Sequence, residues 1–195
     1  MLTAGQTTTM VAVENPATGE VIGSVPNLSA DEVAAAVARA RAAQPAWAAL
    51  GFERRAELLT RCRQWLIDNS DRVADSIVAE NGKPYDEAFI EIAYVLTALE
   101  YWGRTAADLL ADEPVQTGSI FVQGRTLLLR YTPVGVVGVI GPWNNPILNN
   151  FGDVIPALAA GNTALLKPSE IAPLTSLLMT EMTLASGSRP TSTRR

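Results

Sequence analysis

The stretch of residues 133–170 constrains the fold of this chain more than any other, because it contains two short apolar runs joined by a helical pattern. The first run, residues 134–140, is rich in β-branched residues with interleaved glycines, which predicts a strand buried on both faces of a sheet. Asn145 can cap the following helix, and Pro146 suits a first helical position. Residues 163–166 then predict a second strand. A strand–helix–strand unit of this length requires the two strands to be parallel.

Polar side chains follow both predicted strands at the point where each strand ends. Trp143 and Asn144 come after the first strand, and Lys167 and Glu170 come after the second. Ligands of open α/β sheets bind beyond the carboxyl ends of the strands. These two clusters are therefore the candidate site.

Three segments of this region, PVGVVGVIGPWNNP, IPALAAGNTALLKPSE and APLT, resemble the NAD(P)-dependent aldehyde dehydrogenase superfamily at the expected mutual spacing. The segments NPATGEVIGSVP, PAWAAL, RRAELL and ENGKP also resemble the N-terminal region of that family, so the likeness covers about residues 11–182. The resemblance implies an α/β fold, the N-terminal portion of the aldehyde dehydrogenase fold. In it a helical region packs on an incomplete Rossmann-like parallel sheet that carries a β-hairpin arm.

The resemblance also implies roles for five residues. Enzymes of this family oxidise aldehydes with a cysteine thiolate, an asparagine amide, the nicotinamide and a glutamate. Asn144 matches the asparagine that holds the oxyanion, and Lys167 and Glu170 match the pair that holds the adenosine ribose. Ile140 and Trp143 match positions that line the cofactor cleft. Because a ribose-binding carboxylate repels a 2′-phosphate, we expect NAD rather than NADP. No metal is expected.

Each of these residues also has an ordinary structural interpretation. Asn144 could simply shape a turn, as asparagine often does. A lysine at the end of a strand, such as Lys167, is usually a solvated surface charge, and Ile140 would ordinarily belong to the core. The family motif around these residues favours the functional interpretation.

Composition excludes several other classes of function. The net charge of −5 argues against nucleic acid as a main partner. With no histidine and one cysteine, the sequence excludes a Ser-His-Asp triad, the common zinc sites and an internal disulfide. No apolar run is long enough to cross a bilayer and the first residues do not form a secretory leader, so we expect a cytoplasmic protein.

The N-terminal part predicts a hairpin followed by helices. Residues 1–9 are expected to be disordered, and residues 10–118 to hold the hairpin and the helical part of the cofactor domain. Ser29 and Glu32 have the spacing of a capping box ahead of an alanine-rich helix that ends near residue 43. The other predicted helices cover residues 52–67, 71–80 and about 84–102.

Residues 119–132 predict a second hairpin, with a turn at Gln123-Gly124. In the resembled family a hairpin at this position belongs to the arm through which subunits pair, which implies a homo- or hetero-oligomer. Its apolar side chains agree with a covered edge. An ordinary edge hairpin is the alternative.

Residues 133–182 are expected to form the first strand–helix–strand unit of the NAD-binding sheet and a following helix. The basic segment 183–195 departs from the family pattern, which predicts a chain truncated, for example by a frameshift, before the catalytic cysteine and glutamate of the family. A natural disordered basic tail is the alternative. Such a fragment is expected to be inactive and poorly soluble on its own.

Two other functions remain open from the sequence. The fragment could act as a non-catalytic interaction or nucleotide-binding module that pairs with an intact relative. It could also be an active enzyme that uses Cys62, although Cys62 lies with Leu58 and Trp65 on the apolar face of a predicted helix. A cysteine in that setting is usually buried and inert.

Overall fold

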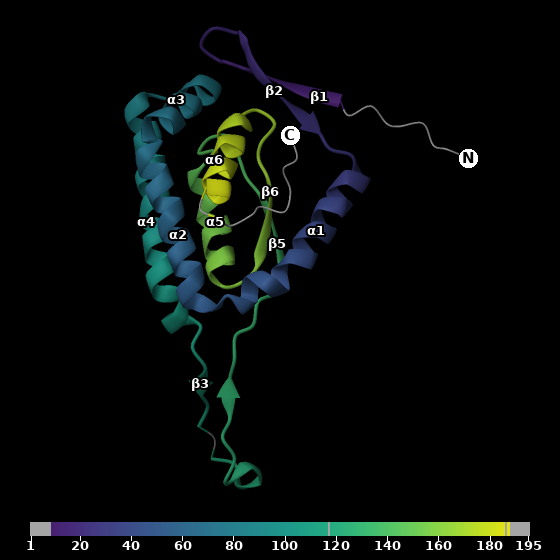
Figure 1. Ribbon diagram of the computed structural model, residues 1–195, viewed down its shortest axis with the longest axis vertical. Coiled ribbons are helices and arrows are strands. Elements are labelled where there is room, and N and C mark those ends of the chain that lie inside the picture. The colour runs from purple at the N-terminus through teal and green to yellow at the C-terminus, as the bar shows by residue number, and fades with distance from the viewer. Residues whose placement is uncertain (1–8, 117, 186, 188–195) are drawn as a thin grey trace, which may run out of the picture.

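The computed structural model describes residues 9–116, 118–185 and 187, so the expectations for residues 1–8 and for most of the basic tail fall outside it. Figure 1 shows the arrangement of the elements. In chain order they are β1 (Thr9–Glu14), β2 (Val21–Asn27), α1 (Ala30–Ala49), α2 (Gly51–Asp68), α3 (Ser70–Asn81), α4 (Tyr85–Leu109), β3 (Glu113–Pro114), the 3₁₀ helix η1 (Ile120–Val122), β4 (Leu128–Leu129), β5 (Val136–Ile140), α5 (Leu148–Ala159), β6 (Thr163–Lys167) and α6 (Leu174–Ala185).

The predicted strand–helix–strand unit is confirmed. Strands β5 and β6 are parallel, with Val136 paired to Thr163 and Ile140 paired to Lys167, and α5 connects them. The helix packs on one face of the strands, where Val139 is buried in the main core. Figure 1 shows the strands between α5 on one side and α1 on the other.

The other face of β5 is open, which contradicts the expectation that this strand is buried on both faces. Gly138 is exposed, and Ile140 is 81% exposed. In the described residues the parallel sheet has only two strands, and α1 packs mainly against β6. The continuous apolar run indicates two covered faces, and here α1 covers the second face of β5 only in part.

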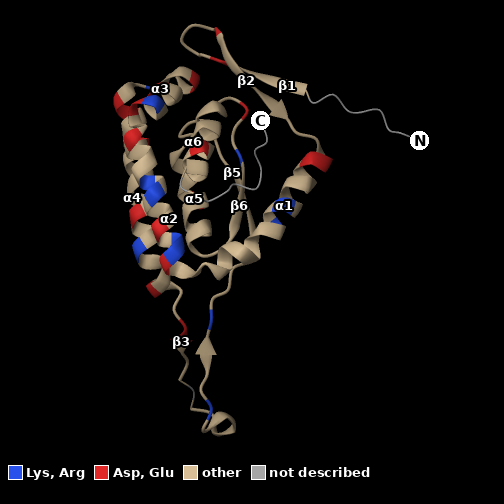
Figure 2. Cartoon of the chain, viewed as in Figure 1, with Lys and Arg blue, Asp and Glu red and all other residues tan. Residues whose placement is uncertain are grey.

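Helices α2, α3 and α4 form a layer beside α5 and α6. Helix α2 packs on α4, and α4 packs in turn on α5. The outer surface of this layer is charged along α2 and α4 (Figure 2). Cys62 is buried in the core, with its Sγ 3.9 Å from the carbonyl oxygen of Met182, as expected for a structural cysteine.

The predicted N-terminal hairpin and capping box are confirmed. Strands β1 and β2 pair antiparallel, and Ser29 and Glu32 satisfy each other's backbone amides at the start of α1. Helix α1 runs six residues beyond the predicted end, through Pro45 to Ala49. Its last turns are held by a tertiary contact that the sequence does not reveal. The Trp47 indole N–H donates to the Leu158 carbonyl at 2.9 Å.

The arm, which is the segment from β3 to β4, differs in detail from the predicted hairpin. The strand before the turn is β3, at Glu113–Pro114, which pairs antiparallel with β4. The expected strand at residues 119–122 is wrong, because Ile120–Val122 forms the 3₁₀ helix and the Ser119 hydroxyl accepts from the Phe121 N–H. Figure 1 shows the arm projecting away from the helices, and Phe121 is 88% exposed in it.

Candidate functional site

The carboxyl ends of β5 and β6 lie side by side and bring the two predicted polar clusters to one edge of the sheet. Ile140 is paired with Lys167 in the last register position. The ladder extends one residue further, because the Gly141 N–H donates to the Lys167 carbonyl at 3.1 Å. The loop that carries Trp143 and Asn144 therefore begins beside Lys167.

Lys167 and Glu170 form an exposed ion pair. The Lys167 ammonium donates to Glu170 Oε2 at 3.2 Å and to the Pro168 carbonyl at 3.1 Å. Both side chains are about two-thirds exposed, at 63% and 68%. A hydrogen bond from its own backbone N–H, followed by the contact with Lys167, lowers the pKa of Glu170. The pair thus offers an ionised acceptor and a cationic donor to a ligand at this edge.

The backbone on each side of the Asn144 side chain is held by the α3–α4 connection. The Asn81 amide donates to the Trp143 carbonyl at 2.6 Å, and the Lys83 ammonium donates to the Asn144 carbonyl at 2.8 Å. The Asn144 side chain is exposed, and among the described residues no hydrogen bond engages its amide. An anchored backbone with a free amide N–H can donate to an oxygen that carries developing negative charge.

Asn145 does not cap the helix that follows, contrary to expectation. Helix α5 begins at Leu148, and the side chain of Asn145 instead accepts a hydrogen bond from Lys83 at 3.0 Å. The cap is Glu91, whose Oε2 accepts from the backbone N–H groups of Ile147 and Leu148 at 3.1 Å each. A single carboxylate oxygen accepts from both N–H groups, and the negative charge of Glu91 suits a helix N-terminus better than the neutral side chain of Asn145.

Sequence reasoning missed Lys83 and Glu91, although one signal was present. Glu91 is 1% exposed and lies on the apolar face of α4 beside Ile92. A charge on such a face requires a buried partner, so its position alone indicates an ion pair. The partner is Lys83, whose ammonium bonds the other oxygen of the Glu91 carboxylate.

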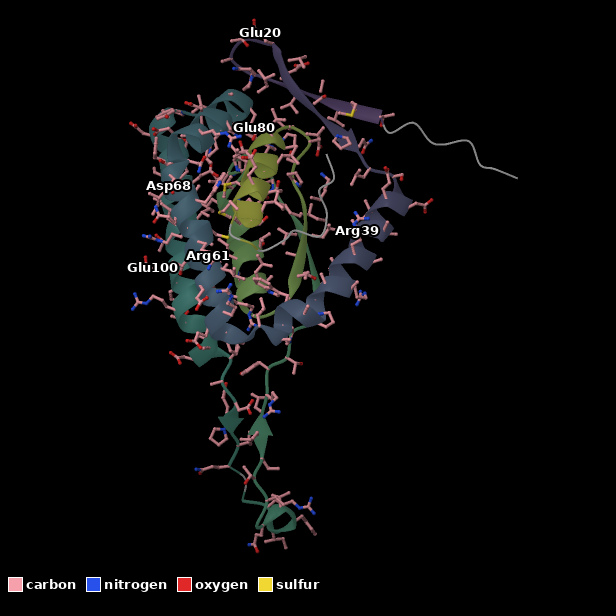
Figure 3. The ribbon with its side chains drawn as sticks, viewed as in Figure 1. Glu20, Arg39, Arg61, Asp68, Glu80 and Glu100 are labelled. Carbon is pink, nitrogen blue, oxygen red and sulfur yellow. The ribbon has the colours of Figure 1, made fainter. Side chains whose placement is uncertain are left out.

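Glu80 caps α6, the helix that follows the strand–helix–strand unit, in the same way. Its carboxylate accepts from the backbone N–H groups of Leu174 at 2.6 Å and Thr175 at 2.8 Å, at the start of α6. Burial raises the pKa of Glu80, and the hydrogen bonds from Thr175 and Leu174 oppose that shift. Figure 3 labels Glu80 beside this end of α6. The N-termini of α5 and α6 are therefore both occupied by carboxylates of the chain itself and do not offer an anion site.

Gly141 is required by a close approach at the start of the site loop. A Cβ atom on Gly141 would lie 1.2 Å from Oδ1 of Asn150, a fully buried residue of α5. The Asn150 amide donates to the Ser176 hydroxyl at 2.9 Å, which joins α5 to α6. Glycine at position 141 therefore permits the contact between the loop and both helices.

The two clusters remain chemically separate. Among the described residues no hydrogen bond or ion pair joins Asn144 to Lys167 or Glu170, and the exposed Ile140 and Trp143 lie on the same edge.

Among the residues that the structure describes, no three metal-ligating side chains gather, and no helix is long and apolar enough to cross a membrane.

Comparisons with known proteins show the family of this chain. The aldehyde dehydrogenase family profile matches residues 2–190. The glutarate-semialdehyde dehydrogenase of Pseudomonas aeruginosa is 39% identical over 183 residues, which are 94% of this chain and 36% of that protein. The succinate-semialdehyde dehydrogenase [NADP(+)] of Escherichia coli is 34% identical over 177 residues, with coverage of 91% and 36%.

The fold is also shared with solved structures of this family. The crystal structure of succinate-semialdehyde dehydrogenase from Burkholderia pseudomallei superposes with a TM-score of 0.88 at 33% identity, covering 94% of this chain and 37% of that one. The chain thus spans a little over a third of the length of these relatives. Since the profile matches nearly the whole sequence and the fold is shared, the chain belongs to the aldehyde dehydrogenase family.

Proposed function

We propose that this chain is the nucleotide-holding part of an enzyme that oxidises an aldehyde to a carboxylic acid with NAD(P)+, and that it also supplies the oxyanion donor of that enzyme. In this proposal Asn144 donates to the oxyanion, Lys167 and Glu170 hold the adenosine ribose, and Ile140 and Trp143 line the cofactor cleft. The observation that carries the proposal is the Asn144 amide, which no described residue bonds, on an anchored loop at the same sheet edge as the exposed Lys167–Glu170 pair.

The chemistry assigns a separate task to each group. Attack of a nucleophile on the aldehyde carbon places negative charge on the carbonyl oxygen, and the Asn144 N–H is suited to stabilise it. One such donor typically contributes about 2.7–4 kcal/mol to lowering the barrier. The nicotinamide accepts the hydride when the dinucleotide is bound.

Glu170 fits a ribose in its ionised form. Its lowered pKa keeps the carboxylate charged at neutral pH, where it can accept from the two ribose hydroxyls while Lys167 donates. The same charge would repel a 2′-phosphate, so we propose a preference for NAD. The E. coli relative is named for NADP+, which makes this preference a specific claim about the present chain.

Cys62 does not supply the nucleophile in this proposal. It is 4% exposed, and its Sγ faces the Met182 carbonyl inside the helical layer. The sequence contains no other cysteine and no histidine. We therefore propose that residues 1–195 alone hold a nucleotide without oxidising an aldehyde. Aldehyde-dependent formation of NADH that disappears in Cys62→Ala would contradict this proposal.

The arm supports a second candidate function, an interaction module. Ile120 and Phe121 are 71% and 88% exposed at its tip, an apolar surface that is favourable to cover with another subunit. We propose self-association, or association with an intact relative, through residues 119–131. Sedimentation of the chain should show a dimer or larger species that Phe121→Ser converts to monomer, and a monomer at all concentrations would contradict it.

The nucleotide proposal is tested by titrating the chain with NAD+ and NADP+ by calorimetry. We expect tighter binding of NAD+, and we expect Glu170→Gln to reduce the ratio of the two affinities by about tenfold. Glu57→Gln is the matched control, because Glu57 forms an exposed ion pair at the same i,i+3 spacing on α2. Equal affinities, or an unchanged ratio in Glu170→Gln, would contradict the proposed role of Glu170.

A further inference from the structure

The connection between α3 and α4 contacts the Asn144 loop at successive positions. Asn81 donates to the Trp143 carbonyl, and Lys83 donates to the Asn144 carbonyl and to the side chain of Asn145. Glu91 continues the series at Ile147 and Leu148 with two hydrogen bonds of 3.1 Å. The loop is thus fixed along its length by residues that lie more than fifty positions earlier in the chain.

The pair at the centre of these contacts is buried and fully used. The side chains of Lys83 and Glu91 are 8% and 2% exposed. An ammonium group has three N–H donors, and Lys83 directs them at Glu91, the Asn144 carbonyl and Asn145. Both oxygens of Glu91 are also engaged, one by Lys83 and one by the start of α5. No hydrogen-bonding capacity of the ammonium is left for a ligand.

We infer that Lys83 and Glu91 are positioning residues, which hold the Asn144 loop so that the Asn144 amide is already oriented when an aldehyde binds. This inference rests on the proposed function in one respect only, the role given to Asn144. Lys83 reaches the carbonyl of Asn144 itself, and Glu91 fixes both Lys83 and the first turn of α5.

Stability alone does not account for this arrangement. A buried ion pair is often no more stabilising than a well-packed apolar pair of the same volume, because both charges must leave water. An apolar pair would not bond the carbonyl of Asn144 or the side chain of Asn145. A donor that is held in place before the reaction needs no reorganisation when charge develops, which is the condition for effective electrostatic stabilisation.

The test compares two double variants of the whole chain. Lys83→Met/Glu91→Gln removes both buried charges together, so neither is left unpaired, and the glutamine can still accept from an α5 amide. Arg72→Met/Glu181→Gln is the control, because that pair also joins two elements, α3 and α6, but is exposed. Backbone ¹⁵N relaxation is measured at Asn144 and Asn145, with urea unfolding of the same samples.

In the wild-type chain we expect order parameters of about 0.85 at both loop residues. In Lys83→Met/Glu91→Gln they should fall below about 0.6, while the value at Val139 in β5 stays unchanged. The Arg72→Met/Glu181→Gln variant should keep the wild-type values at Asn144 and Asn145. A folded Lys83→Met/Glu91→Gln variant with an ordered loop would overturn the inference.

A single substitution keeps the test decisive if the double variant does not fold. Asn81→Ala removes the hydrogen bond to the Trp143 carbonyl and leaves the buried pair in place. It should lower the order parameter at Trp143 while the value at Ile147, which Glu91 still holds, is kept. A uniform fall at both positions would contradict separate anchoring. Because no nucleotide or aldehyde enters these measurements, failure of NAD+ binding would contradict the proposed function and leave this inference standing.

Discussion

Glu80 and Glu91 lie on either side of the α3–α4 turn, and each carboxylate accepts two backbone N–H groups at the start of a different helix. Glu80 caps α6 and Glu91 caps α5. One helical hairpin, α3–α4, therefore fixes the N-termini of both α5 and α6. The orientation of these helices relative to β5 and β6 depends on two carboxylates from outside the sheet.

Replacing Glu80 by alanine should destabilise the chain. The change leaves the N–H groups of Leu174 and Thr175 without their buried acceptor, which costs about 2–3 kcal/mol in the free energy of unfolding. Urea unfolding followed by circular dichroism measures the effect. Glu14→Ala, at an exposed position of β1, should change the same free energy by less than about 0.5 kcal/mol. Equal effects of the two substitutions would contradict the capping role.

Glu80 should also make stability depend on pH. Burial raises its pKa in the folded state above the value of about 4.3 in an unfolded chain. The folded state then binds the Glu80 proton more tightly than the unfolded state does. The contribution of this proton to the free energy of unfolding is complete below about pH 4.3 and is lost as the pH rises through the folded pKa.

This pH dependence is isolated by a comparison with Glu80→Gln. Asp112 and Glu170 have lowered pKa values and act in the opposite direction, because their contributions are lost as the pH falls. Their contributions cancel when the variant is subtracted from the wild type. From about pH 4 to about pH 7 the unfolding free energy of the wild type should decrease relative to that of Glu80→Gln. A difference that stays constant or grows would show that the helix N–H groups outweigh burial.

Gly141→Ala should perturb the site loop through Asn150. The new methyl group would overlap the Asn150 side chain, and relieving that overlap disturbs its hydrogen bond to Ser176. We expect a loss of about 1–3 kcal/mol in the free energy of unfolding. In the Asn150→Ala background the same substitution should cost much less, because the overlapping atoms are gone.

Gly138→Ala is the matched control for this prediction. Gly138 lies in β5, three residues before Gly141, and a Cβ atom there would meet nothing within 4 Å. The change should be neutral or slightly stabilising, because alanine has less conformational freedom to lose on folding. Similar destabilisation at both positions would assign the effect to strand propensity rather than to Asn150.

The sequence predicts those parts of the fold that are determined by neighbouring residues. The capping box of Ser29 and Glu32 needs only three positions of spacing, and the β5–α5–β6 unit is recognisable from local periodicity. Asn145 was expected to cap α5 by the same local reasoning. The actual cap comes from Glu91, 56 positions before Ile147. The sequence indicates that Glu91 needs a buried partner, but it does not indicate that the start of α5 is one.

The candidate site divides along the same line. Lys167, Glu170 and Asn144 were identified from motifs, and their location at one sheet edge follows from the parallel strands. The residues that hold Asn144 are not predicted, because the segment ENGKP is far from Asn144 in the sequence and its contacts with the loop appear only in the fold. A charged residue on an apolar helix face, as Glu91 is on α4, was the one usable signal.

The base of the arm should be ordered by a cross-strand ion pair. Arg130 donates to both carboxylate oxygens of Asp112, one residue beyond the pairing of Glu113 with Leu129, and thereby extends the β3–β4 register. Arg130 lowers the pKa of Asp112. In Asp112→Asn, amide exchange at Leu129 should become faster while exchange at Val139 stays unchanged. Because the pair is exposed, 1 M salt should weaken the difference between wild type and variant, and a salt-independent difference would contradict an ionic contribution.

Arg55 should stabilise the end of α5 opposite to the Glu91 cap. It is 3% exposed, donates to the Ala159 carbonyl at 3.1 Å and to the Ala48 carbonyl at 2.9 Å, and lies over the ring of Phe52. A cation at a helix C-terminus complements the helix dipole, and its removal takes a buried donor from the carbonyls of Ala159 and Ala48. Arg55→Met should therefore lower the free energy of unfolding by about 2–3 kcal/mol in urea titrations.

The neighbouring residue provides the control for Arg55. Arg54 is exposed and pairs with Glu57 on the surface of α2, so Arg54→Met should change the free energy of unfolding by less than about 0.5 kcal/mol. Arg55→Lys should recover only part of the loss, because an ammonium lacks the planar fork that reaches two carbonyls while lying over the Phe52 ring. Full recovery with lysine would mean that charge alone, and not the geometry of the guanidinium, holds the C-terminal end of α5.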